Sequence, residues 1–394
     1  MSRFVIEPVP IPATIDAPDA EAFLGTIDVR NAVETEGFGT DEFEYPAAEL
    51  LPGWLDPYEP KLLFAARADD RIVARGTIQF ALGSDTDTAW ISVQVLPDYR
   101  HLGIGRALAD LLEDLAHDRG CTRVIVYTVS RDGAGPRIPA PTGFGSVPLG
   151  NAEVRFLLAR GYSLEQVERA SRLALPLADG VLEAHRVEAD AAAGADYRVE
   201  GWSDLTPERR HADMAHLRTR MSTDAPSAGL DEPEDPWSVE RLIESERGRL
   251  GTVTVLTSAV EHIPSGRLVG FTQLLVPLDT RRPVVQQDTL VLREHRGHRL
   301  GMLLKIANLQ QLRAGGYPHP SVTTVNAEEN RHMLSINEAL GFVPLAYEGA
   351  WLKATSAPCP LDRGPELPAT VEMPIIGAPD AVAGSERRGE LQRG

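Results

Sequence analysis

Apolar side chains in the first half of the chain follow two periods, one near 3.6 residues and one of two residues, so the pattern predicts helices mixed with strands. Strands are expected over residues 61–67, 71–82 and 88–96, and two aspartates between the first two predict a hairpin turn. The third strand runs into a glycine turn. A helix with one leucine-rich face is expected to begin near Gly105.

The remainder of the first half alternates in the same way. The pattern predicts a helix over residues 19–36, a buried strand over 122–130, a short helix over 152–159 and a strand over 164–175. Residues 132–150 carry many glycines and prolines, which predicts a long loop between the second and third of these elements.

The second half repeats this order of elements. Strands are expected over residues 197–202, 252–261, 267–278, 284–292, 321–326 and 343–353, and helices over residues 207–221, 237–249, 300–313 and 331–339. A repeated order of elements in one chain predicts a duplicated domain. We therefore expect a mixed-sheet fold of the α/β (α+β) class, built twice in tandem.

Composition shifts mark the borders of the two domains. Residues 1–17 are rich in proline and predict an extended lead-in to a first domain over 18–180. An alanine-rich, acidic stretch over 181–196 predicts a linker to a second domain over 197–354. Residues 355–394 are rich in proline, glycine and charge without an apolar period, which predicts a disordered tail.

The overall composition narrows the class of protein. With 394 residues and 43% hydrophobic content, the chain has enough apolar material for two globular cores. Its net charge of −18 disfavours binding to nucleic acid or to an anionic membrane. The charge favours a cationic substrate or simply high solubility. Two cysteines, no leader pattern and no apolar run of spanning length predict a cytoplasmic protein without a disulfide framework.

One sequence motif occurs twice, and the two copies lie at a constant offset. Residues 95–108 and 291–304 share a valine-leucine pair, an arginine, a glycine and a leucine at matching positions. In both, an expected strand ends in a glycine turn and a helix follows. Such a turn leaves backbone N–H groups unpaired ahead of the helix, which suits a phosphate. Glycine turns after strands also occur in other nucleotide-binding loops and in plain turns.

The motif Arg100-x-x-Gly103-x-Gly105 resembles the acyl-CoA pyrophosphate loop of the GCN5-related N-acetyltransferases (GNAT). The second half resembles the family further downstream, where residues 324–330 and the following Leu340-Gly341-Phe342 look like the family's fifth strand and the helix after it. The resemblance covers nearly the whole chain and implies two tandem acyl-CoA N-acyltransferase domains.

The resemblance implies a site for acetyl-CoA, as co-substrate, in each domain. In this family the sheet splays between its fourth and fifth strands, and the pantetheine arm lies in the gap. The residues implied to bind the coenzyme are Val95, Arg100, His101, Leu102, Gly103, Ile104, Gly105 and Arg106 in the first half and Leu290, Val291, Leu292, Arg296, Gly297, His298, Arg299, Leu300, Gly301, Met302, Asn326 and Asn330 in the second.

Direct attack of an amine on the thioester needs a base for the amine proton and an acid for the departing thiolate. Asp288, late on the fourth strand of the second half, is the candidate base, unless it points outward or pairs with an arginine. The acid of the family is usually a tyrosine on the helix after the fifth strand, where this chain has Asn337. Tyr347 on the last strand is the alternative, although strand tyrosines often serve packing.

Each half departs from the family pattern. The first has Ser92 where the second has Asp288, and its loop over 132–150 is unusually long. The second has Arg299 in place of the first loop glycine. These features favour the second domain as the catalyst. Coenzyme binding in both domains and a scaffold role for one of them stay open.

Four histidines next to these motifs raise the question of a metal. They are scattered on loops and helix starts without carboxylates or cysteines at ligand spacing, so no metal site is predicted. They are His101, His295, His298 and His332.

Together these patterns predict an N-acetyltransferase that transfers an acetyl group from acetyl-CoA to a small-molecule amine. A non-catalytic acyl-CoA-binding or sensor protein and a protein-lysine acetyltransferase are the two alternatives. The identity of the amine and the oligomeric state stay open.

Overall fold

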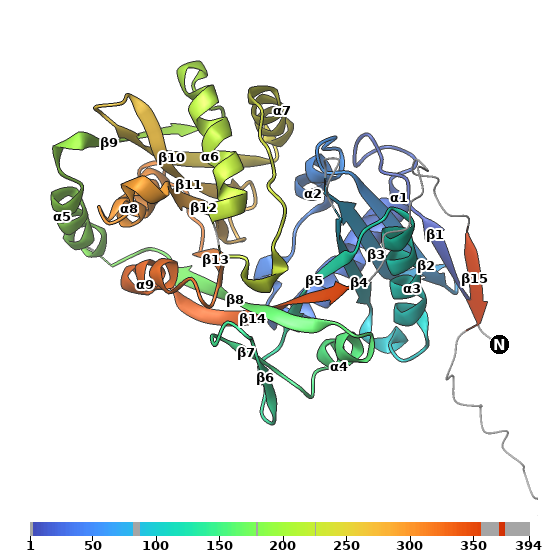
Figure 1. The fold of residues 1–394 in the computed structure, drawn as a ribbon. Coiled ribbons are helices and arrows are strands. Elements are labelled where there is room, and N and C mark those ends of the chain that lie inside the picture. The colour runs from blue at the N-terminus through green and yellow to red at the C-terminus, as the bar shows by residue number, and fades with distance from the viewer. Residues whose placement is uncertain (1–2, 82–86, 179, 225, 356–369, 375–394) are drawn as a thin grey trace, which may run out of the picture.

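A computed structural model describes residues 3–81, 87–178, 180–224, 226–355 and 370–374. Within these residues, thirteen strands form one continuous sheet that runs through both halves of the chain (Figure 1). The strand order is β15-β1-β2-β3-β4-β5-β14-β8-β13-β12-β11-β10-β9. The mixed α/β sheet expected from the sequence is confirmed, and the two halves share it.

The first half contributes β1 (Arg3–Pro8), β2 (Lys61–Ala68), β3 (Arg71–Phe80), β4 (Thr88–Val95), β5 (Arg123–Ser130) and β8 (Ser163–Ala174). The second half contributes β9 (Tyr197–Ser203), β10 (Val253–His262), β11 (Arg267–Pro277), β12 (Val284–Val291), β13 (Ser321–Ala327) and β14 (Val343–Ala354). The fourth and fifth strands of each half, β4 with β5 and β12 with β13, are paired in parallel, and the other neighbours are antiparallel.

The last strands of the two halves are exchanged at the centre of the sheet. β14, from the end of the second half, pairs with β5 of the first half, and β8, from the end of the first half, pairs with β13 of the second. Trp351 of β14 is fully buried in the core of the first half, and Leu173 of β8 lies in the core of the second. Each core is therefore completed by the other half.

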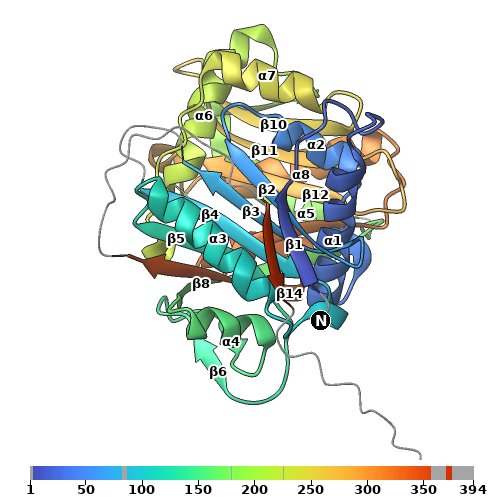
Figure 2. The same cartoon turned by 90° about the vertical axis from the view of Figure 1, so that its right-hand side faces the viewer.

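The helices cover both faces of the sheet (Figures 1 and 2). One face, which we call the α1/α6 face, carries α1 (Glu21–Phe38), α2 (Ala47–Trp54), α6 (His211–Asp224) and α7 (Val239–Arg249). The opposite α3/α8 face carries α3 (Ile104–Asp118), α4 (Ala152–Ala159), α8 (Leu300–Ala314) and α9 (Arg331–Leu340). Leu108 of α3 and Leu304 of α8 each pack over a glycine on the strand below, Gly76 and Gly270.

Several segments have more regular structure than the sequence pattern predicts. The linker segment is a helix, α5 (Val181–Ala193), because its alanines favour helix and Leu182 and Ala189 are buried in the second-half core. The lead-in contains β1, and the loop over 132–150 holds a separate hairpin of β6 (Arg137–Pro139) and β7 (Ser146–Pro148).

The predicted disordered tail falls largely outside the described residues. Its one described element, β15 (Val371–Pro374), pairs with the edge strand β1. No helix among the described residues is long and apolar enough to cross a membrane.

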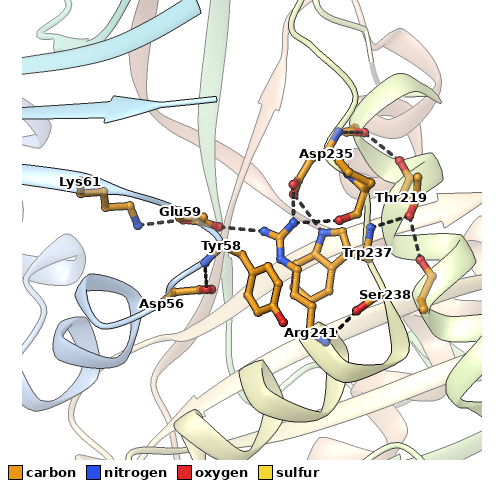
Figure 3. A network of polar contacts seen from close by, with 12 residues as sticks. Asp56, Tyr58, Glu59, Lys61, Thr219, Asp235, Trp237, Ser238 and Arg241 are labelled. Atoms are coloured by element: carbon orange, nitrogen blue, oxygen red, sulfur yellow. Dashed lines mark hydrogen bonds and ion pairs between the residues drawn. The ribbon is translucent and has the colours of Figure 1, made fainter. Parts of the chain in front are cut away.

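A second contact between the halves is centred on Arg241 of α7, which is 2% exposed (Figure 3). Its guanidinium pairs with Asp235 of its own half and, at 3.5 Å, with Glu59 from the first half. The ring of Trp237 lies 4.2 Å from it, and that of Tyr58 lies 5.4 Å away. The charge is thus shared between residues of both halves, which holds α7 against the segment that leads into β2.

Candidate active site

The two strand-turn-helix junctions predicted from the repeat have the same backbone. In the first half, a 3-10 turn over Pro97–Tyr99 links β4 to the loop before α3. In the second half, a 3-10 turn over Arg293–His295 links β12 to the loop before α8. The residue before each helix is left-handed, with φ of 87° at Gly103 and 53° at Arg299. Two residues earlier, His101 and Gly297 are also left-handed, with φ of 63° and 90°. The second half thus builds the same turn with its glycine moved by two positions.

Both junctions present main-chain N–H groups without help from a side-chain cap. The residues that precede α3 and α8 form no capping hydrogen bond, so the first-turn amides of each helix are free for an anion. Arg100 and Arg296 both bond to the strand behind the turn. Arg100 Nε donates to the Val95 carbonyl oxygen at 3.1 Å, and Arg296 Nε donates to the Val291 carbonyl oxygen at 3.0 Å. Any phosphate contact at these turns therefore depends on backbone amides.

The same two arginines also carry ion pairs to the first helix of their own half. Arg100 pairs with Glu36 of α1, and Arg296 pairs with Asp224 of α6 at 3.3 Å. Arg106, in contrast, is exposed and has no ion pair among the described residues, so its charge is available to a ligand.

The sheet splays next to each junction, at the point that the family resemblance implies. β4 and β5 are paired from Thr88–Arg123 only as far as Trp90–Ile125. β12 and β13 are paired at Val284–Val322 and Val285–Thr323 and then separate. Beyond these rungs the facing backbone groups of each strand pair have no ladder partner, which leaves a gap that an extended amide-bearing chain can enter.

In the first half, a hollow lies on each face of the sheet, and the one on the α1/α6 face lies at the splay. On the α3/α8 face a groove of about 480 Å³ runs between α3 and α4. On the α1/α6 face a pocket of about 360 Å³ lies over the end of the β4–β5 pairing. The groove is lined by Arg106, Asp110, Glu113, Phe156, Ala159, Arg160 and Lys353, and the pocket by residues that include Trp54, Lys61, Thr77, Trp90, Ser92 and Tyr127.

In the second half, side chains fill the corresponding spaces. A Cβ placed on Gly301 would lie 3.3 Å from Ile336 of α9, so α9 is packed directly on the start of α8. The hydroxyl of Thr324 donates to the Gln286 carbonyl at 3.3 Å across the beginning of the splay. On the other face, Arg218 of α6 pairs with Asp288 at 2.8 Å and stacks over Phe271.

The two predicted catalytic residues are not brought together. Asp288 lies at a β-bulge of β12 on the α1/α6 face, where its carboxylate is paired with Arg218. Tyr347 lies on the exchanged strand β14 and packs against the first-half core. β8 and β13 lie between the two strands, so the structure gives no support for a shared role in one site.

The other predicted coenzyme residues lie at the two junctions, apart from two asparagines near α9. Asn330 caps α9, since its side-chain oxygen accepts from the Met333 N–H at 3.2 Å. Asn326 at the end of β13 accepts a hydrogen bond from Asn337 at 2.7 Å. Both therefore have structural partners in the second half.

Sequence reasoning missed Tyr127, which lines the first-half pocket from β5. Its hydroxyl donates to Glu232, which comes from the loop between α6 and α7 of the second half. Burial, followed by the charge of Glu232, raises the pKa of Tyr127 above its usual range. No periodicity marks this contact, because it joins residues of the two halves that are far apart in the chain.

A second feature without a sequence signal is a pair of facing carboxylates at the exchanged strands. Glu168 of β8 lies directly opposite Glu348 of β14. The pKa of Glu348 is raised to about 8, first by burial and then by the charge of Glu168. Burial, and then Glu232 and Glu329, raises the pKa of Glu168 to about 7.

The histidines near the motifs do not gather into a ligand set. Among the described residues, no group of three or more histidine, cysteine, aspartate or glutamate side chains is placed to hold a metal ion. The ring centroids of His295 and His262 lie 4.8 Å apart with the planes inclined at 54°, and His295 also forms a hydrogen bond with the Tyr197 hydroxyl at 3.0 Å.

Comparison with protein families identifies part of the first half. Residues 27–134 match the acetyltransferase (GNAT) family. The first half thus contains a match to a GNAT domain. Members of this family use an acyl-CoA as co-substrate, and the match covers the β4–α3 junction, the splay and the start of the long loop of the first half.

Solved structures with the same fold extend the likeness to both halves. A tandem GNAT protein from the clavulanic acid biosynthesis pathway aligns over 90% of this chain and 99% of its own, with 22% identity and a TM-score of 0.65. A GCN5-related N-acetyltransferase from Sphaerobacter thermophilus aligns over 91% of this chain and 98% of its own, with 15% identity and a TM-score of 0.55. At these identities the likeness concerns the fold, which is the tandem GNAT fold. A comparison with curated proteins found no match.

Proposed function

We propose that the protein is an N-acetyltransferase that transfers an acetyl group from acetyl-CoA to the amine of a small molecule, and that the reaction takes place in the first half. The observation that carries this proposal is the pocket at the first-half splay, together with the groove between α3 and α4 on the other face of the sheet. A coenzyme can approach from the α3–α4 groove and an acceptor from the opposite pocket, so that the two meet in the gap.

The coenzyme is held at the start of α3. Its pyrophosphate lies against the free first-turn amides, where the helix dipole favours negative charge. A Cβ at Gly105 would meet only Val95 at 3.5 Å and Val93 at 4.0 Å, both from the strand below, so no other residue crowds this position. The pantetheine arm follows the unpaired edge of β4 into the splay, where a backbone N–H can polarise the thioester carbonyl.

The acceptor pocket has the size of a small-molecule site, since pockets of about 300–1,000 Å³ are typical of such ligands. The amine nitrogen forms a bond to the thioester carbonyl carbon, and the carbon–sulfur bond breaks. The amine proton passes to the Tyr127 oxygen as Tyr127 gives its own proton to Glu232, and the same pair returns a proton to the CoA thiolate. The raised pKa of Tyr127 keeps it protonated before the reaction starts.

The second half is the other candidate, and its case depends on Asp288. The bulge in β12 and the carboxylate on the α1/α6 face favour it. Against it stand the ion pair to Arg218 and the packing of Ile336 on Gly301, which both occupy space that substrates need. The assignment of Asp288 as base stays a prediction for this second candidate.

A matched pair of charge substitutions tests which half binds the coenzyme. Gly103→Asp places a carboxylate directly before α3, beside the first-turn amides, and aspartate is one of the residues that tolerate a left-handed φ. We expect a ~100-fold rise in the Kd for acetyl-CoA by calorimetry, because two negative groups then compete for one set of amides. Arg299→Asp makes the corresponding change in the second half and is expected to leave the Kd within about twofold.

The reverse result would assign the coenzyme to the second half. Thiol release from acetyl-CoA with a panel of small amines and lysine peptides then tests the chemistry. Coenzyme binding without release on any acceptor would favour a sensor, and release on peptides alone would favour a protein-lysine acetyltransferase.

A further inference from the structure

Arg75 of β3 is a buried arginine without a partner. It is 7% exposed, and its Nε and Nη1 form no hydrogen bond. Within the described residues it forms no ion pair, and its guanidinium carbon lies 5.8 Å from the centre of the Trp54 ring. A buried charge that lacks a partner costs several kcal/mol, and proteins rarely keep one unless a ligand completes it.

The charged neighbours of Arg75 do not bond to it. Arg30 of α1 is the neighbouring cation, and its Nη1 donates to Asn31 at 2.9 Å and to the Phe43 carbonyl at 3.0 Å. Glu34 is the neighbouring acid, and its carboxylate accepts from Gln94 at 2.6 Å while forming no ion pair within the described residues. What Arg75 lacks is therefore a hydrogen-bonding partner for its Nε and Nη1.

The strand register places Arg75 one cross-strand pair beyond the residues that line the acceptor pocket. Two cross-strand pairs, Gln79 with Trp90 and Thr77 with Ser92, lie along the pocket floor, and Arg75 with Gln94 is the next pair on the same face. Consecutive pairs on one face are ~7 Å apart along the strand. Trp54 lines the pocket and also contacts Arg75, so this side chain connects the two.

We infer that the acceptor is an amine that carries a carboxylate and that Arg75 binds this carboxylate. This inference rests on the proposed function of the first half and names the class of its acceptor. An amino acid carries an amine and a carboxylate on one small molecule, so it can occupy the pocket at Ser92 while its carboxylate extends towards Arg75. A guanidinium suits a planar carboxylate, because its N–H groups form charge-assisted hydrogen bonds with the two oxygens.

The second half provides an internal comparison. The position that corresponds to Arg75 in the repeat holds Phe271, which is fully buried beneath Arg218. Arg218 itself is paired with Asp288. Among the described residues, no cation thus takes the place of Arg75 in the second half, and we expect carboxylate recognition at this position only in the first half.

Matched acceptors test the inference without any mutation. Lysine and cadaverine differ by one carboxylate, as do arginine and agmatine. We expect kcat/KM to be at least ~30-fold higher for the carboxylated member of a pair, because a buried charge-assisted contact is lost with the other. Equal values within both pairs would overturn the inference, and so would a higher value for phosphoethanolamine than for every amino acid tested.

Two variants locate the effect at Arg75. Arg75→Met removes the charge and keeps an apolar stem, and we expect it to abolish the preference while kcat/KM for cadaverine and the Kd for acetyl-CoA stay unchanged. Its thermal midpoint should equal or exceed that of the wild type, since an unpaired buried charge is removed. Arg75→Lys should retain part of the preference. An equal loss for both members of a pair in Arg75→Met would contradict the role.

Calorimetry of amine binding separates this inference from the proposed function. Turnover of both members of a pair at equal rates would keep the acetyltransferase proposal and reject the carboxylate subsite. Binding of lysine but not cadaverine to the wild type, without turnover of any amine, would keep the subsite and reject the acetyltransferase proposal.

Discussion

The two junctions of this chain have the same backbone but different surroundings. α3 in the first half has one buried face, whereas α8 in the second half is buried on nearly all sides. Arg106, which lines the open groove, corresponds in the repeat to Met302, and Asp110 corresponds to Ile306, which is fully buried. The difference arises because α5 packs on the outer side of α8, where α3 has open solvent.

This contrast shows that a repeated backbone does not imply a repeated function. The turn before each helix is retained, down to two left-handed residues at matching positions. The space beside the turn is retained only in the first half. A duplicated fold can therefore keep one copy as a binding site while the other contributes packing, a strand and a loop to its partner.

The largest expected effect comes from the strand exchange at the centre. Trp351 belongs to the second half in sequence, but it is fully buried in the first-half core. We expect Trp351→Ala to lower the free energy of unfolding by about 3–5 kcal/mol, since it removes a large buried ring and leaves a cavity. Urea denaturation followed by fluorescence and circular dichroism measures the loss.

Leu173→Ala makes the reciprocal change, because Leu173 comes from the first half and lies in the second-half core. Its expected cost is about 2–5 kcal/mol. Both variants should unfold in one transition, as the exchanged strands couple the cores. Two separate transitions in either variant would show that the halves unfold independently.

Sequence reasoning predicted the fold class and the duplicated junctions, because periodicity and turn residues are local signals. It did not predict the strand exchange, since β8 and β14 have the same pattern whichever half they join. Arg299 was noted as a departure from the loop pattern, and the structure shows that an arginine can hold the left-handed conformation there. Arg75 and the Tyr127–Glu232 contact had no signal, because burial and partners depend on the three-dimensional arrangement.

The facing carboxylates at the exchanged strands should make stability depend on pH. The raised pKa values, about 8 for Glu348 and about 7 for Glu168, mean that the folded chain holds these protons when the unfolded chain has released them. Stability is therefore fully present below the ordinary glutamate pKa and is lost as pH rises towards 8. Arg30 opposes the shift of Glu348, whereas Glu168 and Glu34 add to it.

Glu348→Gln removes this titration from the seam between the halves. We expect the variant to be more stable than the wild type by about 1–3 kcal/mol at pH 8.5 and equal to it at pH 5, measured by urea denaturation at both values. Glu183→Gln, at an exposed position of α5, is the control and should change neither. An equal effect of Glu348→Gln at both pH values would contradict the assignment.

The smallest effect tests why the glycine moved by two positions between the junctions. Gly297 has a φ of 90°, and a Cβ added there would meet no atom within 4 Å, so any cost of Gly297→Ala is conformational. We expect a loss of about 1 kcal/mol in the free energy of unfolding. Arg299→Gly should change the free energy of unfolding by less than about 0.5 kcal/mol, because a φ of 53° lies near the left-handed minimum and little backbone strain is removed. The greater conformational freedom of glycine in the unfolded chain offsets that small gain.

If both variants also leave the Kd for acetyl-CoA unchanged, the second turn is needed for folding and the first for the ligand. A large rise in that Kd from either one would assign a coenzyme to the second turn as well.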